Sequence, residues 1–190
     1  AAPMPVELIR QFEAKTGLTL LEGYGLTEGT CGSCANPPAG ERRPGSIGLP
    51  MPYCEVRIKV LDEQGRYLRD AEQDEIGNLC IRGATVFRGY LQASKNADIW
   101  VDGDWFNTGD LGRVDADGYI WLTGRSKDLI IRGGVNISPE EIDQLLGGHP
   151  LLAEACVFSL PDPTMGERIG LAYVPRGADD VSLSDVTDYL

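Results

Sequence analysis

The sequence predicts an α+β protein that is rich in strands in its middle and ends in a smaller α+β part. Residues 5–16 repeat apolar side chains at helical spacing. Residues 55–123 alternate apolar and polar side chains between turn-forming segments, which is typical of strands. After Gly124, short apolar runs alternate with a helical pattern. This change of pattern predicts two domains, over residues 1–127 and 128–190.

The N-terminal part is expected to hold one helix, one strand and a long loop. The helix over residues 5–16 should end at Gly17, because glycine readily adopts the conformation that stops a helix. The apolar run 18–21 predicts a buried strand that leads into a glycine-rich turn at residues 23–29. Five prolines within residues 31–53 favour a loop there.

The middle of the chain predicts a series of short strands. Five are expected, over residues 55–60, 78–82, 86–90, 111–114 and 119–123. The alternation in the first of them places Lys59 on its polar face. Residues 115–118, Asp-Ala-Asp-Gly, share a pattern with calcium loops, but the rest of that ligand series is absent. A hairpin turn is therefore the prediction for them.

The C-terminal part predicts three strands and two helices. The strands are expected over residues 129–131, 151–160 and 171–174. Ser138 is placed to cap a helix, with Pro139 at its first position and Glu141 at its third. Either Ser182 or Ser184 could cap a last helix.

Composition excludes several classes of protein. The 17 Lys and Arg residues against 29 Asp and Glu give a net charge of −12, which argues against nucleic-acid binding because phosphates need a basic face. No apolar run approaches the ~20 residues of a membrane-spanning helix. Five scattered cysteines fit a reduced cytoplasmic chain better than a disulfide scaffold. The chain begins at Ala1 without a methionine, which indicates a fragment. Nothing in the sequence indicates the oligomeric state.

The glycine-rich turn at residues 23–29 is the first segment that could carry chemistry. Its glycines let backbone N–H groups approach an anion, Thr27 can donate a hydroxyl, and Glu28 can hold a cation that neutralises phosphate. The spacing matches neither a dinucleotide fingerprint nor a Walker loop. An ordinary tight turn stays open as the alternative.

Two further segments have polar side chains suited to a ligand. Asp110 follows a glycine turn and could accept two hydrogen bonds from a vicinal diol such as that of ribose. Residues 124–134 carry Arg125, Lys127 and Arg132 in an acidic protein, which favours an anion site. A capped turn and a solvated linker are the respective alternatives.

The Cys31-Gly-Ser-Cys34 segment is not expected to bind metal or act in redox chemistry. No second cysteine pair lies nearby and His149 is the only histidine, so four zinc ligands are hard to assemble. His149 itself lies at the end of a predicted helix, where a capping or packing role is expected.

Taken in order, these segments resemble the adenylate-forming superfamily and, within it, the acyl-CoA synthetases. The likeness extends from residue 1 to about residue 174. The matching stretches are residues 24–28, 108–110, 124–128 and 133–142, with a weaker match at 161–167. The resemblance implies that residues 1–127 are the β-rich, distorted-barrel end of the large adenylating domain. Residues 128–190 would be the small mobile C-terminal domain, and both domains would be incomplete.

The family's activity is the two-step joining of a carboxylic acid to a thiol. The carboxylate attacks the α-phosphorus of ATP to give acyl-AMP and pyrophosphate, and coenzyme A then takes the acyl group. The resemblance implies a small-molecule acid, expected to be a fatty acid, with ATP, Mg²⁺ and coenzyme A. The alternatives are an acyl-AMP ligase, a peptide-synthetase-type adenylation domain that loads a carrier protein, or a catalytically inert fragment.

The resemblance also implies roles for individual residues of the nucleotide site. Tyr24 would stack on adenine, with Gly25 beside the nucleotide. Thr27 would contact the α-phosphate, Glu28 would hold Mg²⁺, and Asp110 would bind the ribose hydroxyls. Thr27 and Glu28 are thereby expected to be catalytic.

Further roles are implied for residues after the strand-rich part. Arg125 would support the nucleotide as a third catalytic residue, and Asp128 would be the hinge of the small domain. Gly133 and Gly134 would lie beside the channel for the pantetheine arm of coenzyme A.

Several features of the family are placed less firmly or are missing. Gly23 and residues 45–48 would border the acyl pocket, and residues 1–3 resemble the end of the adenine-side loop. Asn107 stands where many members have arginine. The family's phosphate loop would lie before Ala1 and its catalytic lysine beyond Leu190. The 190 residues alone are therefore expected not to adenylate an acid.

Overall fold

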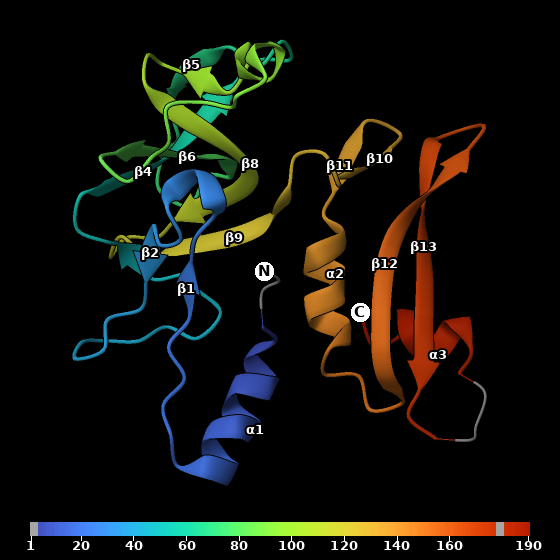
Figure 1. The fold of residues 1–190 in the computed structure, drawn as a ribbon. Helices are drawn as coiled ribbons and strands as arrows, with labels where there is room; N and C mark the ends of the chain where they lie inside the picture. Colours follow the sequence, from blue (N-terminus) through green and yellow to red (C-terminus); the bar gives the residue numbers. More distant parts are fainter. Residues whose placement is uncertain (1–3, 178–180) are drawn as a thin grey trace. The chain divides into compact units, whose positions relative to one another are not determined.

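The computed structural model describes residues 4–177 and 181–190, so the expected adenine-side segment at residues 1–3 lies outside the described residues. The chain forms two compact units, residues 1–123 and 124–190. The division falls four residues before the predicted domain boundary. Figure 1 shows the strand-rich character of both units and their few helices.

The described residues of the first unit form one α-helix, two short 3-10 helices and nine strands. Its elements are α1 (Val6–Thr16), β1 (Gly23–Tyr24), η1 (Thr27–Gly29), β2 (Cys34–Ala35), β3 (Leu49–Pro50), β4 (Cys54–Leu61), β5 (Tyr67–Asp70), β6 (Gly77–Gly83), η2 (Ala93–Asn96), β7 (Trp100–Val101), β8 (Trp105–Val114) and β9 (Ile120–Arg125), whose last two residues fall in the second unit. Strands β1, β2 and β3 form a small sheet, and the order β5-β4-β6-β8-β7 forms a larger one in which β9 also pairs with β8. The paired strands for which a register is given run antiparallel.

The apolar face of the larger sheet builds the core of this unit. Strands β4, β6 and β8 supply most of the side chains, and β2, β9 and a loop supply the rest. The buried members are Cys34, Ile47, Cys54, Val56, Ile58, Leu79, Ile81, Phe106 and Ile120. The predicted alternation of apolar side chains in β4 is confirmed at Val56 and Ile58, which are buried.

Lys59 is a correction to the predicted polar face of β4. Its side chain is 1% exposed, and its Nζ lies 2.8 Å from carboxylate oxygens of both Asp70 and Asp102. The ammonium group also lies over the rings of Tyr67 and Trp105. Burial lowers the pKa of Lys59, but the two hydrogen-bonded carboxylates outweigh it and raise the pKa overall. Partners far along the chain therefore permit a buried charge that the local pattern does not indicate.

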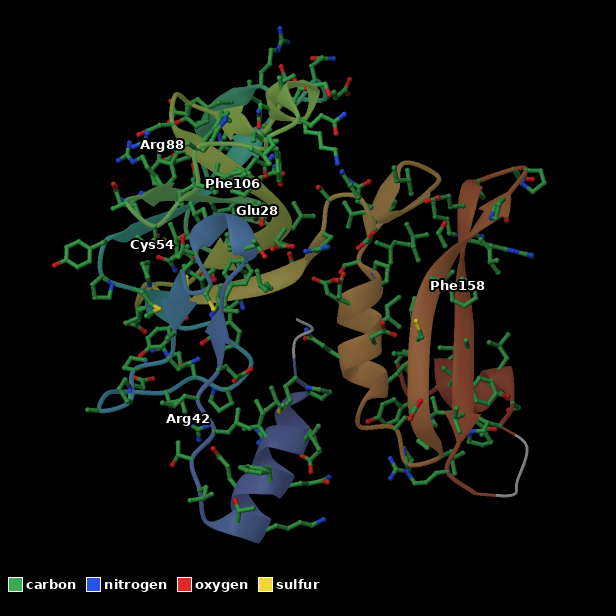
Figure 2. The ribbon with its side chains drawn as sticks, in the orientation of Figure 1. Glu28, Arg42, Cys54, Arg88, Phe106 and Phe158 are labelled. Atoms are coloured by element: carbon green, nitrogen blue, oxygen red, sulfur yellow. The ribbon has the colours of Figure 1, made fainter. Side chains whose placement is uncertain are left out.

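The predicted strand at residues 18–21 is wrong, because side chains rather than a neighbouring strand satisfy that backbone. The Leu20 N–H donates to Glu13 Oε1 at 2.8 Å, and the Leu20 carbonyl accepts from Arg42 at 2.9 Å. Arg42 is labelled in Figure 2. Leu18 is 63% exposed, so the run is not buried either. The helix before it is confirmed and ends at Gly17, with φ of 69°.

The predicted strand at residues 86–90 is also wrong. Gly89 has φ of +129°, and the Asn96 side chain bonds both the N–H and the carbonyl of Tyr90. These contacts hold the segment as a loop between β6 and η2. By contrast, the strand predicted at residues 78–82 is confirmed as β6.

The hairpin predicted around residues 115–118 is confirmed between β8 and β9. Arg43 reaches it from the proline-rich loop, donating to Asp115 Oδ2 at 2.7 Å and to Asp117 Oδ2 at 2.6 Å. The Arg43 guanidinium also lies 4.3 Å from the centre of the Tyr119 ring. The two aspartates therefore anchor a loop, as turn residues commonly do.

In the part of the second unit that the structure describes, two helices pack against a four-stranded antiparallel sheet. Its elements are β10 (Ile130–Arg132), β11 (Val135–Ile137), α2 (Pro139–Leu146), β12 (Leu152–Asp162), β13 (Gly166–Pro175) and α3 (Leu183–Thr187). The strand order is β11-β10-β13-β12, and α2 lies beside β12 (Figure 1). The buried core residues are Ile130, Leu146, Leu152, Val157 and Val186. Strand β11 was not predicted, because three residues after two glycines carry too little pattern.

The predicted caps of this unit are confirmed. Ser138 accepts the N–H of Glu141 at the start of α2, and Ser182 forms a full capping box with Asp185 at the start of α3. His149 is buried, which fits the expected capping or packing role: its Nδ1 accepts the Leu151 N–H, so its Nε2 donates to the Asp185 carbonyl. Among the described residues, no helix is long and apolar enough to cross a membrane.

Candidate functional site

The turn after β1 can form only with glycine at position 25. A Cβ built on Gly25 would lie 1.4 Å from the carbonyl oxygen of Cys31, because the chain folds back on itself here. Two backbone hydrogen bonds hold this return: Ser33 N–H to the Tyr24 carbonyl at 2.8 Å, and Cys31 N–H to the Leu26 carbonyl at 3.1 Å. The turn therefore fixes where Tyr24 and the following η1 residues lie.

A bulge in β8 pushes the predicted diol-binding aspartate out of the regular ladder. Asn78 of β6 pairs with Leu111, but Cys80, two residues on, pairs with Asn107. Three residues of β8, 108–110, therefore lie opposite the single residue Leu79 of β6, and Gly109 takes a φ of +80° within them. Bulges of this kind commonly re-aim side chains next to active sites. Asp110 is 7% exposed at the end of this bulge.

The turn and the bulge meet through one hydrogen bond. The phenol of Tyr24 donates to Asp110 Oδ2 at 2.5 Å, across 86 positions of sequence. Burial and, next, the bond to Asp110 raise the pKa of Tyr24, so the phenol stays protonated and donates. The Asp110 N–H in turn donates to Thr108 Oγ1 at 3.1 Å, and the Thr108 hydroxyl donates to the Leu79 carbonyl. Two motifs that the sequence analysis singled out separately thus form one structural feature.

Glu28 lies in η1, beside Thr27. The Tyr90 hydroxyl donates to Glu28 Oε1 at 2.7 Å, and the Phe87 N–H donates to the Glu28 carbonyl at 2.8 Å. Glu28 is half-buried and Thr27 is exposed. Figure 2 labels Glu28 together with Phe106 and Arg88 of the same unit. Tyr90 is a contact that the sequence analysis missed. The Gly-Tyr pair at 89–90 could have indicated a loop rather than a strand.

The donor set around Glu28 suits one kind of cation. Within residues 4–177 and 181–190, no three His, Cys, Asp or Glu side chains gather in a way that could hold a metal. Mg²⁺ does not need such a cage, since it commonly binds one or two carboxylates, several waters and the phosphates of a substrate. One half-buried carboxylate beside an exposed hydroxyl fits that arrangement.

The glycines expected to border an acyl pocket have structural reasons of their own. A Cβ on Gly48 would lie 2.1 Å from the backbone of Ala35, and one on Gly23 would lie 3.1 Å from the Cys34 carbonyl oxygen. Gly45 has φ of +90° and donates its N–H to Glu22 Oε2 at 2.8 Å. Ser46 between them is buried. Their place beside an acyl group stays a prediction.

Arg125 and Asp128 flank one turn in the second unit. The Asp128 N–H donates to the Arg125 carbonyl at 3.1 Å, and both side chains are exposed. Gly124, just before them, lies against the start of α2, where its Cβ would come within 2.6 Å of Ser138 Oγ. An exposed turn is compatible with a hinge at Asp128, which stays a prediction together with the role of Arg125.

Gly133 and Gly134 form the two-residue turn between β10 and β11. Arg132 pairs with Val135 across it, and the glycines have φ of +57° and +84°. Two successive positive φ values are what a tight hairpin of this hand requires. A Cβ on Gly133 would also lie 2.5 Å from the Met165 methyl carbon, whereas one on Gly134 would have no atom of the described residues within 4 Å. The turn alone explains both glycines, so their part in coenzyme A binding stays a prediction.

The first unit therefore unites four of the predicted site residues. Tyr24, Thr27 and Glu28 stand on consecutive short elements, and Asp110 joins them through Tyr24. Gly25, the fifth predicted site residue of this unit, lies in the turn between Tyr24 and Thr27. The second unit carries the other four on two turns: Arg125 and Asp128 on one, Gly133 and Gly134 on the other.

Comparison with known proteins identifies the class to which this architecture belongs. Residues 1–91 match the AMP-binding enzyme family. The chain is 44% identical over 174 residues to marinolic acid–CoA ligase from Pseudoalteromonas sp., covering 92% of this chain and 26% of that enzyme. It is 39% identical over 188 residues to sulfoacetate–CoA ligase from Cupriavidus necator, covering 96% of this chain and 36% of that enzyme.

A solved structure gives the same assignment. ATP-bound MatB from Rhodopseudomonas palustris matches with a TM-score of 0.90 at 32% identity, over 100% of this chain and 37% of MatB. The chain thus spans between about a quarter and just over a third of the proteins it resembles. It contains part of an AMP-binding domain of the adenylate-forming superfamily. The predicted family and β-rich fold class are confirmed.

Proposed function

We propose that this chain is part of an acid–thiol ligase that activates a carboxylic acid with ATP and transfers the acyl group to coenzyme A. The observation that carries the proposal is the Tyr24–Asp110 hydrogen bond, which joins an aromatic ring and a carboxylate beside the Thr27–Glu28 turn. The two relatives named above are both CoA ligases, which supports this reaction class.

In this proposal, different residues of the first unit bind different parts of ATP. The ring of Tyr24, fixed through its hydroxyl, stacks on adenine, and Gly25 keeps the backbone close to the nucleotide. Asp110 accepts hydrogen bonds from the ribose hydroxyls, and Thr27 donates to the α-phosphate. Glu28 holds Mg²⁺, which supplies positive charge next to the phosphates when bound. These contacts place the α-phosphorus where a carboxylate can attack and offset the charge of two anions that must meet.

The second unit contributes to the proposal through its two exposed turns. Arg125 adds a permanent positive charge for the nucleotide, and Asp128 is the hinge that takes up a change of backbone angles between the two steps. Gly133 and Gly134 present backbone without side chains, past which the pantetheine thiol reaches the acyl-AMP. We place the reaction in the cytoplasm, which the five free cysteines support.

The acid is proposed to be a fatty acid, and a panel of acids tests this. The two relatives are named for different acids, marinolic acid and sulfoacetate, so the panel combines short, long, aromatic and dianionic acids. The full-length protein is incubated with each acid, ATP, Mg²⁺ and coenzyme A, and acyl-CoA and pyrophosphate are measured. We expect acid-dependent pyrophosphate and acyl-CoA, highest with a fatty acid.

The same assay separates the alternatives. Pyrophosphate with acyl-AMP but no acyl-CoA would favour loading of a carrier protein. No acid-dependent pyrophosphate from the full-length protein would contradict the proposal. The 190 residues alone should give none, since the family's phosphate loop and catalytic lysine match nothing within them.

A further inference from the structure

Glu28 is held by a single loop at two points. This loop, residues 84–92, runs between β6 and η2. Its Tyr90 hydroxyl donates to Glu28 Oε1 at 2.7 Å, and its Phe87 N–H donates to the Glu28 carbonyl at 2.8 Å. Side chain and backbone of the carboxylate-bearing residue are therefore fixed by the same short segment.

Tyr90 is itself fixed by Asn96. The Asn96 Oδ1 accepts the Tyr90 N–H at 2.7 Å, and the Asn96 amide donates to the Tyr90 carbonyl at 2.9 Å. Gly89 permits this clamp, because a Cβ there would lie 2.9 Å from Asn96 Oδ1. Asn96 therefore fixes the backbone from which the Tyr90 side chain extends, and a group on a fixed backbone positions its partner more precisely.

Phe87 ties the loop to the core of the first unit. Its ring stands edge-on to Tyr90 with centroids 4.9 Å apart, and edge-on to the buried Phe106 with centroids 5.1 Å apart. Trp100 lies on the same aromatic cluster, 6.0 Å from Phe87. Tyr90 therefore stands on a rigid support rather than on a mobile loop tip.

The choice of a phenol as donor has an electrostatic consequence. A lysine or arginine in this place would neutralise the Glu28 carboxylate and compete with a cation. A tyrosine hydroxyl fixes the same oxygen and leaves the full negative charge. Among the described residues, the other oxygen, Oε2, has no hydrogen-bond partner. The carboxylate is therefore oriented by one oxygen while the other can take a metal ligand position.

We propose that Tyr90 is a positioning residue that orients the Glu28 carboxylate to receive the Mg²⁺ of bound ATP. This inference rests on the proposed function, because it assigns a support to the residue expected to hold the metal. Partners that orient a metal ligand commonly change metal affinity or activity 10- to 100-fold when removed.

The test uses Tyr90→Phe in the full-length protein. Affinity for ATP is measured by calorimetry with Mg²⁺ and again with a chelator. The ratio of the two affinities is the gain from Mg²⁺, and it is compared between the variant and the wild type. We expect Tyr90→Phe to reduce the gain from Mg²⁺ by about tenfold. Affinity for AMP without metal should stay within about twofold of the wild type, because the hydroxyl acts only through Glu28.

Tyr67→Phe is the matched control. It removes a tyrosine hydroxyl that also donates to a carboxylate, Asp70 Oδ1 at 3.2 Å, on β5. The gain from Mg²⁺ should be unchanged in this variant. Asn96→Ala supplies a second test, because it releases the backbone of Tyr90 but keeps the hydroxyl. We expect it to reduce the gain from Mg²⁺ too, by less than Tyr90→Phe does.

A double variant shows whether Tyr90 acts through Glu28. Once Glu28→Gln has removed the charge, adding Tyr90→Phe should change the Mg²⁺ gain no further. A second, additive loss would overturn the inference, and so would an unchanged gain in Tyr90→Phe alone. If the wild-type protein itself bound no ATP, the proposed function would fail and this inference with it.

Discussion

Gly25→Ala is expected to abolish acid-dependent pyrophosphate release by the full-length protein. The added methyl carbon would lie 1.4 Å from the Cys31 carbonyl oxygen, which is backbone and cannot swing aside. The turn must therefore open, and Tyr24 and Glu28 on either side of it move together. A displacement of about 1 Å at a catalytic group can cost ~100-fold in rate, and we expect at least that loss.

Gly177→Ala is the control for this prediction. No atom of the described residues lies within 4 Å of a Cβ built there, and its φ lies outside the left-handed region, so melting temperature and rate should match the wild type. A Gly25→Ala enzyme with wild-type kcat/KM for ATP would show that the turn does not hold the nucleotide.

Asp110→Asn is expected to give the second large loss, on kcat/KM for ATP. The change removes the negative charge from the group proposed to accept from the ribose hydroxyls, and it weakens the acceptor of the Tyr24 phenol. Charge-assisted hydrogen bonds of this kind contribute about 2 to 3 kcal/mol, which corresponds to a loss of roughly 30- to 150-fold. Steady-state kinetics with ATP varied at saturating acid measures it.

Two controls refine the result. Asp104→Asn alters an exposed aspartate that forms a 3.4 Å ion pair with Arg82, and should leave ATP kinetics unchanged. Tyr24→Phe keeps the ring that stacks on adenine and removes only the bond to Asp110, so its loss should be smaller. Unaltered ATP kinetics in Asp110→Asn would remove Asp110 from the ribose site.

The residues of the proposed nucleotide site could be singled out from sequence because each stands in a short motif whose backbone needs are visible. Gly25 and Gly109 mark sharp turns, and the proposed chemistry is assigned to the polar side chains beside them. The motifs do not predict the hydrogen bond between Tyr24 and Asp110, because 86 positions separate the two residues. The bulge that re-aims Asp110 depends on how β8 pairs with β6, which no local pattern encodes.

The errors share one physical cause, which is polar contact between distant segments. Residues 18–21 look like a strand, but Glu13 and Arg42 take up their backbone groups. Lys59 looks like a surface residue, but two aspartates from other strands and turns permit its burial. Tyr90 sits in an apolar run that suggests a strand, while Asn96 holds it in a loop. Local strand propensity does not decide the structure where such contacts between distant segments exist.

The central claim is that one nucleotide touches both the 24–28 turn and the β8 bulge. A crystal structure of the full-length protein with AMP tests this most directly. We expect adenine against the ring of Tyr24 and both ribose hydroxyls within hydrogen-bonding distance of Asp110. AMP bound elsewhere, with Tyr24 and Asp110 untouched, would contradict it.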